Sequence, residues 1–231
     1  MTASNDLPAQ PNASSPRAPS PSLDTAQQLL KQNRQWATAM KQQDPEFFSR
    51  LASGQSPKFL WIGCSDSRVP ADTITGTKPG QIFIHRNIAN TVVHTDLNLL
   101  SVLTYAVEVL KVEHVIVCGH AECGGVRAAM SNQDLGQLNH WLRNIKDVYA
   151  AHYEALQAIS SPAEREYRLI ELNAIEQVKK LAATGIIQRA WSNRSGPWLH
   201  AWVYKLEDGL LHEVMSMAPG SPVPAPYAFN L

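Results

Sequence analysis

Two short clusters of side chains in this 231-residue sequence have the types and spacing that chemistry needs. The first is Cys64, Asp66 and Arg68, separated by single serines, and the second is His120 and Cys123 in an H-x-x-C step. Two thiolates and one imidazole form a borderline-soft donor set that suits zinc. Three protein ligands leave a fourth position open for water or substrate, which is typical of a catalytic zinc site. Cys64, His120 and Cys123 are therefore the candidate metal ligands.

Asp66 and Arg68 are the candidate partners of that metal site. Two residues apart in an extended loop, they can face the same side, so that the guanidinium keeps the carboxylate ionised and fixes its direction. A purely structural salt bridge is the alternative. Their position beside Cys64 favours a role in orienting a metal-bound water.

The other cysteine and the other histidines have simpler interpretations. Cys118 lies inside a valine-rich segment and is interpreted as a packed thiol. An odd total of three cysteines argues against a disulfide framework, although a redox pair between Cys64 and Cys123 is an alternative to metal binding. The remaining histidines lack a comparable context and are interpreted as polar or packed residues.

Short apolar runs must position the two clusters. Residues 59–62, 81–84 and 113–118 are rich in aromatic and β-branched side chains and predict buried strands. Between the last two, residues 94–110 predict an amphipathic helix with a Thr or Asp cap. Strand, helix and strand in this order indicate a parallel sheet. Because ligands bind at the carboxyl edge of such a sheet, we expect both clusters to share one crevice.

The rest of the chain completes an α/β fold. Residues 24–40, about 138–159 and about 163–183 predict helices, and residues 199–204 and 210–215 predict an antiparallel hairpin. Residues 1–22, rich in Ala, Ser, Asn and Pro, are expected to be a disordered extension. We expect residues 23–231 to form a single domain, with a mostly parallel central sheet flanked by helices, an antiparallel C-terminal hairpin and an N-terminal helical arm.

Charge and hydropathy limit the partners. The 20 basic and 20 acidic residues cancel, which excludes the strong field expected for binding nucleic acid or an anionic membrane. No apolar run approaches the roughly 18 to 20 residues of a membrane span, and the first thirty residues lack an apolar export segment. The expected partner is a small molecule, and the expected location is the cytoplasm.

The two clusters resemble the C-x-D-x-R and H-x-x-C motifs of the β-class carbonic anhydrases. The similarity runs from about residue 24 to 217 and includes the segments 60–63, 69–70, 85–87, 94–98 and 123–125. It implies zinc held by Cys64, His120 and Cys123, and reversible hydration of CO2 to bicarbonate and a proton by zinc-bound hydroxide. By the same resemblance, Asp66 accepts the hydroxide's proton in a hydrogen bond and Arg68 holds Asp66. It also implies a homodimer or homotetramer, with the helix of residues 24–40 packed on a second subunit.

One subtype of this family is more similar still, because its bicarbonate binds a non-catalytic pocket made by a tryptophan, an arginine and a tyrosine. Trp61, Arg86 and Tyr204 stand at the matching positions. In that subtype the aspartate can leave its arginine and ligate the zinc, so Asp66 would also be a metal ligand in a closed, inactive state. Packing in the core is the alternative role for Trp61 and Tyr204.

Two rival functions stay open at this point. One is a non-catalytic zinc-binding regulatory module on the same fold, and the other is a related lyase that acts on a CO2 analogue such as carbon disulfide. The intact pair of Asp66 and Arg68 argues against the non-catalytic module, because a site without catalytic activity does not need this pair.

Overall fold

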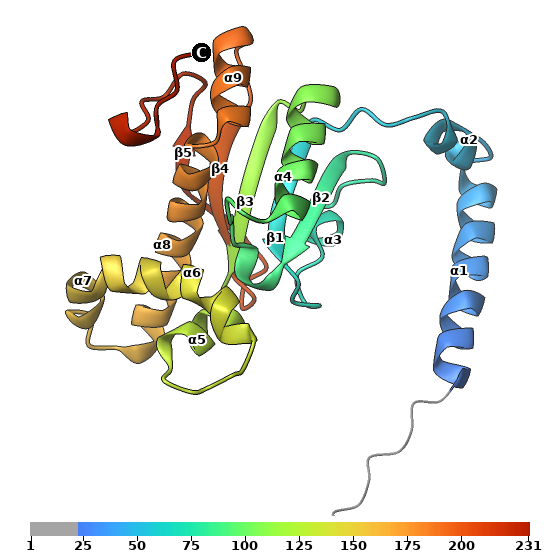
Figure 1. The fold of residues 1–231 in the computed structure, drawn as a ribbon. Helices are drawn as coiled ribbons and strands as arrows, with labels where there is room; N and C mark the ends of the chain where they lie inside the picture. The colour runs from blue at the N-terminus through green and yellow to red at the C-terminus, as the bar shows by residue number, and fades with distance from the viewer. Residues whose placement is uncertain (1–22) are drawn as a thin grey trace, which may run out of the picture. The chain divides into compact units, whose positions relative to one another are not determined.

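The computed structural model describes residues 23–231 (Figure 1). The expected disorder of residues 1–22 lies outside the described residues. The chain divides into two compact units, with the boundary between Ser53 and Gly54.

The described part of the first unit consists of helices α1 (Leu23–Gln43) and α2 (Phe47–Ala52). The helix predicted over residues 24–40 is therefore present and slightly longer. Trp36 packs edge-on against Phe47 and Phe48, with ring centroids 6.2 and 5.7 Å apart. Leu29 and Leu30 on α1 stay 64% and 60% exposed within this chain.

The second unit is built on a five-stranded sheet of order β2-β1-β3-β4-β5. Its strands are β1 (Phe59–Cys64), β2 (Ile82–Asn87), β3 (His114–His120), β4 (Trp198–Tyr204) and β5 (Leu211–Met217). The first four strands are parallel, and β5 pairs antiparallel with β4, as the sequence predicts. Since β1 and β3 are neighbours, Cys64 and His120 leave the sheet at the same edge.

Helices flank this sheet as the α/β pattern predicts (Figure 1). They are α3 (Ala71–Thr75), α4 (Leu97–Thr104), α5 (Gly124–Met130), α6 (Leu138–Ala151), α7 (Tyr153–Gln157), α8 (Pro162–Ala182) and α9 (Gly185–Asn193). Shorter turns are η1 (Ile88–Asn90), the π-helical η2 (Tyr105–Val109) and η3 (Ala225–Tyr227). Asp96 caps α4 by accepting a hydrogen bond from the Asn98 backbone N–H, so the aspartate is the cap.

Two features of the helices differ from the sequence prediction. The helix predicted over 138–159 is broken at His152, whose non-helical backbone (φ −115°, ψ 17°) separates α6 from α7. The helix α9 is not predicted at all. It follows α8 closely and is capped by Thr184, whose side chain accepts a hydrogen bond from the Ile187 backbone N–H.

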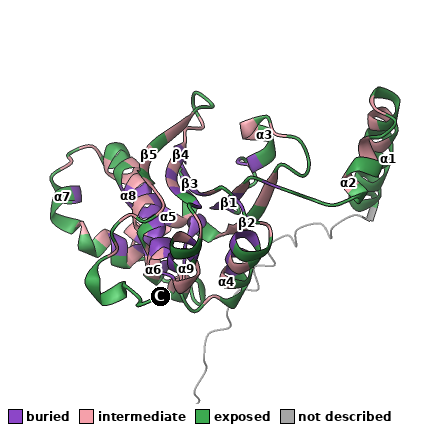
Figure 2. Ribbon diagram, turned by 90° about the horizontal axis from the view of Figure 1, so that it is seen from above, coloured by how far each residue is buried: buried purple, intermediate pink, exposed green. Residues whose placement is uncertain are grey.

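The two faces of the sheet have different apolar partners. Alternate residues of β1, such as Leu60 and Ile62, face a core shared with α4, α8 and α9. The intervening Trp61 faces the other side, in a smaller cluster with Ile116 and Cys118. Buried residues gather on the central strands and on α8 (Figure 2). Among the described residues, no helix has the length and apolar character required to cross a membrane.

Candidate metal centre

Three side chains from separate elements meet at the carboxyl edge of the sheet. Cys64 ends β1, His120 ends β3, and Cys123 immediately precedes α5. Their ligand atoms all lie within 4.8 Å of one another, and the residues are only 6%, 1% and 1% exposed. Within residues 23–231 no other group of three or more His, Cys, Asp and Glu side chains has this geometry. The crevice predicted from the two sequence clusters is therefore formed.

The geometry of the two sulfurs and the imidazole fits a tetrahedral zinc ion. The two Sγ atoms lie 4.0 Å apart, and zinc–sulfur bonds of about 2.3 Å in a tetrahedron require about 3.8 Å. His120 Nδ1 lies 2.9 Å from the Ala121 carbonyl oxygen, to which it must donate a proton. That tautomer leaves Nε2 with a lone pair, and Nε2 is buried without a hydrogen-bond partner. An orphaned buried nitrogen beside two thiols is the arrangement that a metal ion satisfies.

The charge state of the thiols also favours a cation. The hydrogen bond from Cys123 lowers the pKa of the Cys64 thiol, whereas the same contact and burial raise the pKa of Cys123. Two thiolates this close in a buried site repel each other, so both can ionise only with a cation between them. Cys118 is different, because burial raises its pKa and its Sγ donates to the Gly119 carbonyl oxygen at 3.2 Å. Its environment is that of a packed thiol.

Asp66 and Arg68 form a two-pronged ion pair beside the metal site. The Asp66 Oδ1 accepts hydrogen bonds from the Arg68 backbone N–H (2.9 Å) and Nε (3.0 Å), and Oδ2 accepts one from Nη2 (2.8 Å). The guanidinium holds the pKa of Asp66 well below its usual range. Asp66 Oδ2 also lies 3.8 Å from His120 Nε2. The carboxylate is therefore ionised, fixed in direction and adjacent to the open side of the ligand set.

Arg86 braces the loop that carries these residues. Its Nε donates to the Cys64 carbonyl oxygen at 2.8 Å, and its Nη2 donates to the Asp66 carbonyl oxygen at 2.5 Å. Because β2 runs beside β1, Arg86 lies level with Gly63 in the register and can reach both carbonyls.

Trp61 and Tyr204 lie on the same side of the sheet, in the aromatic cluster opposite α4 and α8. The Trp61 indole covers Gly63, where an added Cβ would lie only 2.4 Å from Nε1. Tyr204 is level with His120 in the β3–β4 register, and its carbonyl oxygen accepts a hydrogen bond from the Ala121 N–H at 2.9 Å. All three residues proposed from the sequence for a second pocket are thus near the carboxyl edge of the sheet.

A tight turn that sequence reasoning missed also supports the metal ligands. Ala89 and Asn90 in η1 have left-handed backbones (φ 59° and 47°), and the Ala89 N–H donates to Cys64. The turn packs so closely on the start of α5 that a Cβ at Gly125 would lie 3.1 Å from the Ala89 Cβ. A left-handed backbone is costly for a residue other than glycine, so other groups must hold it.

Two buried amides on α8 hold this turn. Asn173 Nδ2 donates to the Ala89 carbonyl oxygen at 3.1 Å, and Asn173 Oδ1 accepts from Gln177 Nε2 at 2.9 Å. Gln177 Oε1 in turn accepts from the Val92 backbone N–H at 2.8 Å. Polar residues four apart on the otherwise apolar, buried face of α8 were the signal in the sequence that could have revealed them.

The fold and the site together define the class of protein: an α/β metalloprotein with a Cys-His-Cys zinc site at the carboxyl edge of a parallel sheet. A family model described as carbonic anhydrase matches residues 59–211. A carbonic anhydrase of Emericella nidulans is 50% identical over 196 residues, covering 85% of this chain and 86% of the relative. A carbonic anhydrase of Saccharomyces cerevisiae is 32% identical over 204 residues, covering 85% and 91%.

Solved structures agree with these sequence matches. A tetrameric β-carbonic anhydrase from Sordaria macrospora has a TM-score of 0.81 at 42% identity, covering 84% of this chain and 100% of its own. The Coccomyxa β-carbonic anhydrase in complex with acetazolamide has a TM-score of 0.79 at 34% identity, covering 83% and 87%. The chain belongs to the carbonic anhydrase family, in its β class. It is an enzyme of CO2 hydration, rather than the non-catalytic module that the sequence left open.

Proposed function

We propose that Asp66 and Arg68 are the catalytic carboxylate and its positioning residue in CO2 hydration. The observation that carries this proposal is the two-pronged ion pair beside His120 Nε2. Zinc bound by Cys64, His120 and Cys123 supplies the activation of water for attack on CO2.

The chain's own part is to hold one acceptor oxygen in place. Arg68 donates two hydrogen bonds to Asp66 Oδ1 and one to Oδ2, so the second lone pair of Oδ2 is free to accept a hydrogen bond at the open side of the ligand set. Accepting that hydrogen bond orients the attacking oxygen toward the substrate.

Replacement of Asp66 by Asn tests this role. We expect stopped-flow CO2 hydration to fall by about 100-fold or more, the usual effect of removing a proton-handling group, while zinc content stays unchanged. Asp147→Asn is the matched control, since Asp147 pairs with Arg143 at 2.8 Å on the exposed face of α6. An Asp66→Asn enzyme with full zinc and wild-type rate would contradict the proposal.

We also infer that bicarbonate binds near Trp61, Arg86 and Tyr204 and inhibits the enzyme. Arg86 supplies a positive charge beside the loop that carries Asp66. Because it donates hydrogen bonds to the Cys64 and Asp66 carbonyl oxygens, an anion that binds Arg86 would act on the loop of the metal site. In the inactive state that we infer, Asp66 would leave Arg68 and join Cys64, His120 and Cys123 as a ligand of the zinc.

Conservative aromatic changes test this regulatory site. Trp61→Phe and Tyr204→Phe should relieve inhibition by bicarbonate and leave zinc content unchanged. Trp198→Phe is the control, because Trp198 is a 42% exposed aromatic at the opposite end of β4. Unaltered inhibition in both test variants would argue against the pocket.

We further propose that the enzyme is a homodimer or homotetramer in which α1 packs on a second subunit. The solved relative from Sordaria macrospora is tetrameric, and Leu29 and Leu30 leave an apolar stripe on α1 exposed within one chain. Light scattering of Leu29→Glu should show a lower mass than wild type. Leu210→Glu, an equally exposed leucine beside the hairpin turn, should not change the mass.

A further inference from the structure

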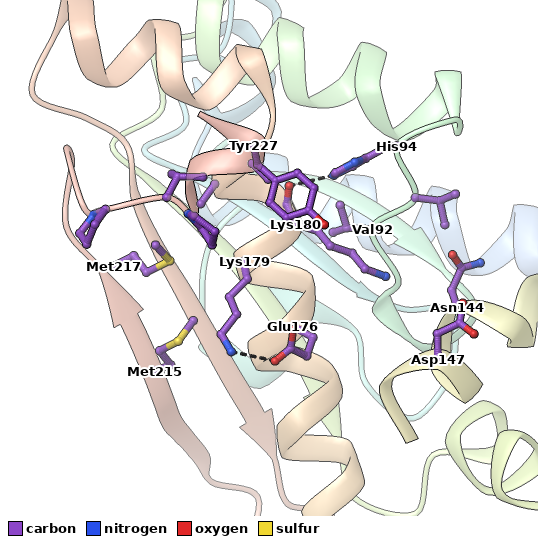
Figure 3. A pocket seen from close by; sticks show the side chains of 16 residues that line it. Val92, His94, Asn144, Asp147, Glu176, Lys179, Lys180, Met215, Met217 and Tyr227 are labelled. Carbon is purple, nitrogen blue, oxygen red and sulfur yellow. Dashed lines mark hydrogen bonds and ion pairs between the residues drawn. The ribbon is translucent and has the colours of Figure 1, made fainter. Parts of the chain in front are cut away.

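One cavity of the second unit is lined by none of the metal-site residues. It has a volume of about 740 Å3 and lies between β5, α8, the segment 92–94 and the C-terminal segment 222–227 (Figure 3). This volume falls within the range of about 300 to 1,000 Å3 that is usual for small-molecule sites. The lining is mostly apolar and includes Val92, Met215, Met217 and Val223. Methionine side chains adapt their shape to a ligand, so this lining favours a flexible apolar body.

The wall formed by the C-terminal segment is anchored in place. Gln188 of α9 donates from Nε2 to the Tyr227 carbonyl oxygen at 2.9 Å and accepts from the Phe229 N–H at 2.9 Å. The Tyr227 side chain is thereby held at the rim of the cavity, and its hydroxyl has no hydrogen-bond partner among the described residues.

The acidic groups of the cavity already have partners. Glu176 accepts from Lys179 at 2.8 Å, drawn as a dashed line in Figure 3, and Asp147 pairs with Arg143 at 2.8 Å. Lys180, next to Lys179 on α8, has no ion pair or hydrogen bond at its Nζ within the described part of the chain. Burial lowers its pKa, and the nearby carboxylates Asp147 and Glu176 offset only part of this effect.

The cavity therefore has unpaired donors at one side and apolar surface at the other. An ammonium without a direct ion pair and a free hydroxyl are complementary to a carboxylate, and an apolar lining is complementary to a hydrocarbon chain. We propose that this cavity binds a small amphipathic carboxylate, whose carboxylate is held by Lys180 and Tyr227 and whose chain contacts Met215, Met217 and Val223.

The test is calorimetric titration of the zinc-loaded full chain with octanoate. We expect saturable binding, weakened about tenfold or more by Lys180→Met, which keeps most of the aliphatic stem. Lys179→Met is the matched control, because it removes the neighbouring lysine that is already paired, and it should change the affinity by less than about threefold. Tyr227→Phe should weaken binding about threefold.

Two further ligands separate this site from the metal centre and from general apolar binding. Octanol has the same chain without the charge, and it should bind more weakly than octanoate and be insensitive to Lys180→Met. Acetate can bind at the metal, and any such binding should be the same in wild type and Lys180→Met. The proposal is overturned if octanoate shows no saturable binding, if Lys180→Met binds it as wild type does, or if both lysine variants weaken it equally.

Discussion

Replacing Asn173 by Leu should weaken zinc binding although Asn173 contacts no ligand atom. Its side chain makes two buried hydrogen bonds, to the Ala89 carbonyl oxygen and from Gln177 Nε2. Leucine has the same number and branching of side-chain heavy atoms but no polar atoms, so Gln177 Nε2 loses its acceptor and the Ala89 carbonyl oxygen keeps only the hydrogen bond from Thr91 Oγ1 at 3.3 Å. Asn173 itself is only 1% exposed and Gln177 is fully buried, so water cannot replace the lost contacts without rearrangement.

The magnitude follows from these two contacts. Leaving the buried Gln177 Nε2 unpaired costs about 1–3 kcal/mol, and losing one of the two hydrogen bonds to the Ala89 carbonyl costs about 0.5–1.5 kcal/mol, so we expect the free energy of unfolding to fall by about 2–4 kcal/mol. The left-handed turn at Ala89 then loses the restraint that α8 provides, which weakens the hydrogen bond from the Ala89 N–H to Cys64. Loss of a group that orients a metal ligand typically weakens metal binding by about 10- to 100-fold.

Two measurements separate a local effect on the metal site from general destabilisation. Zinc affinity is measured by competition with a chromophoric chelator, and the free energy of unfolding is measured by urea denaturation. Gln188→Leu is the matched control, because Gln188 is also a buried amide on a helix but anchors the C-terminal segment. It should lower stability to a similar extent and leave zinc affinity unchanged. Wild-type zinc affinity in a destabilised Asn173→Leu would refute the reasoning.

Three other predictions concern protonation and the cysteines. In Arg68→Met the pKa of Asp66 returns toward its ordinary value of about 3.9. A lowered carboxyl pKa stabilises the fold at pH values above the ordinary pKa, and this stabilisation is lost as the pH falls toward the folded-state pKa. The difference in urea stability between wild type and Arg68→Met should therefore be constant above about pH 5 and shrink below about pH 4. CO2 hydration should rise toward alkaline pH, and because Asp66 stays ionised over about pH 6 to 9, the rise should come from groups at the metal site. A flat stopped-flow profile over this range would contradict the prediction. Metal analysis should find zinc retained in Cys118→Ala and lost in Cys64→Ser. Equal zinc content in both variants would contradict the interpretation of Cys118 as a packed thiol and Cys64 as a ligand.

The chemistry of the metal site could be predicted from the sequence because its ligands follow strand ends directly. Cys64 and His120 each close a short apolar run, and adjacent parallel strands bring such ends to one edge whatever their distance in the chain. The ion pair of Asp66 and Arg68 was equally accessible, since the two residues are neighbours in one loop. The cytoplasmic location and the single domain remain predictions.

Long-range contacts decided the features of the structure that the sequence did not predict. The sequence by itself determined the ligand types, the sheet class and the hairpin, because spacing and periodicity are local properties of the chain. Only the tertiary structure brought Asn173 of α8 to the turn at Ala89, 84 residues away, and closed a cavity over Lys180 with the C-terminal segment. Whether a buried amide or lysine is paired depends on which backbone groups the fold brings near it, and no local pattern encodes that proximity.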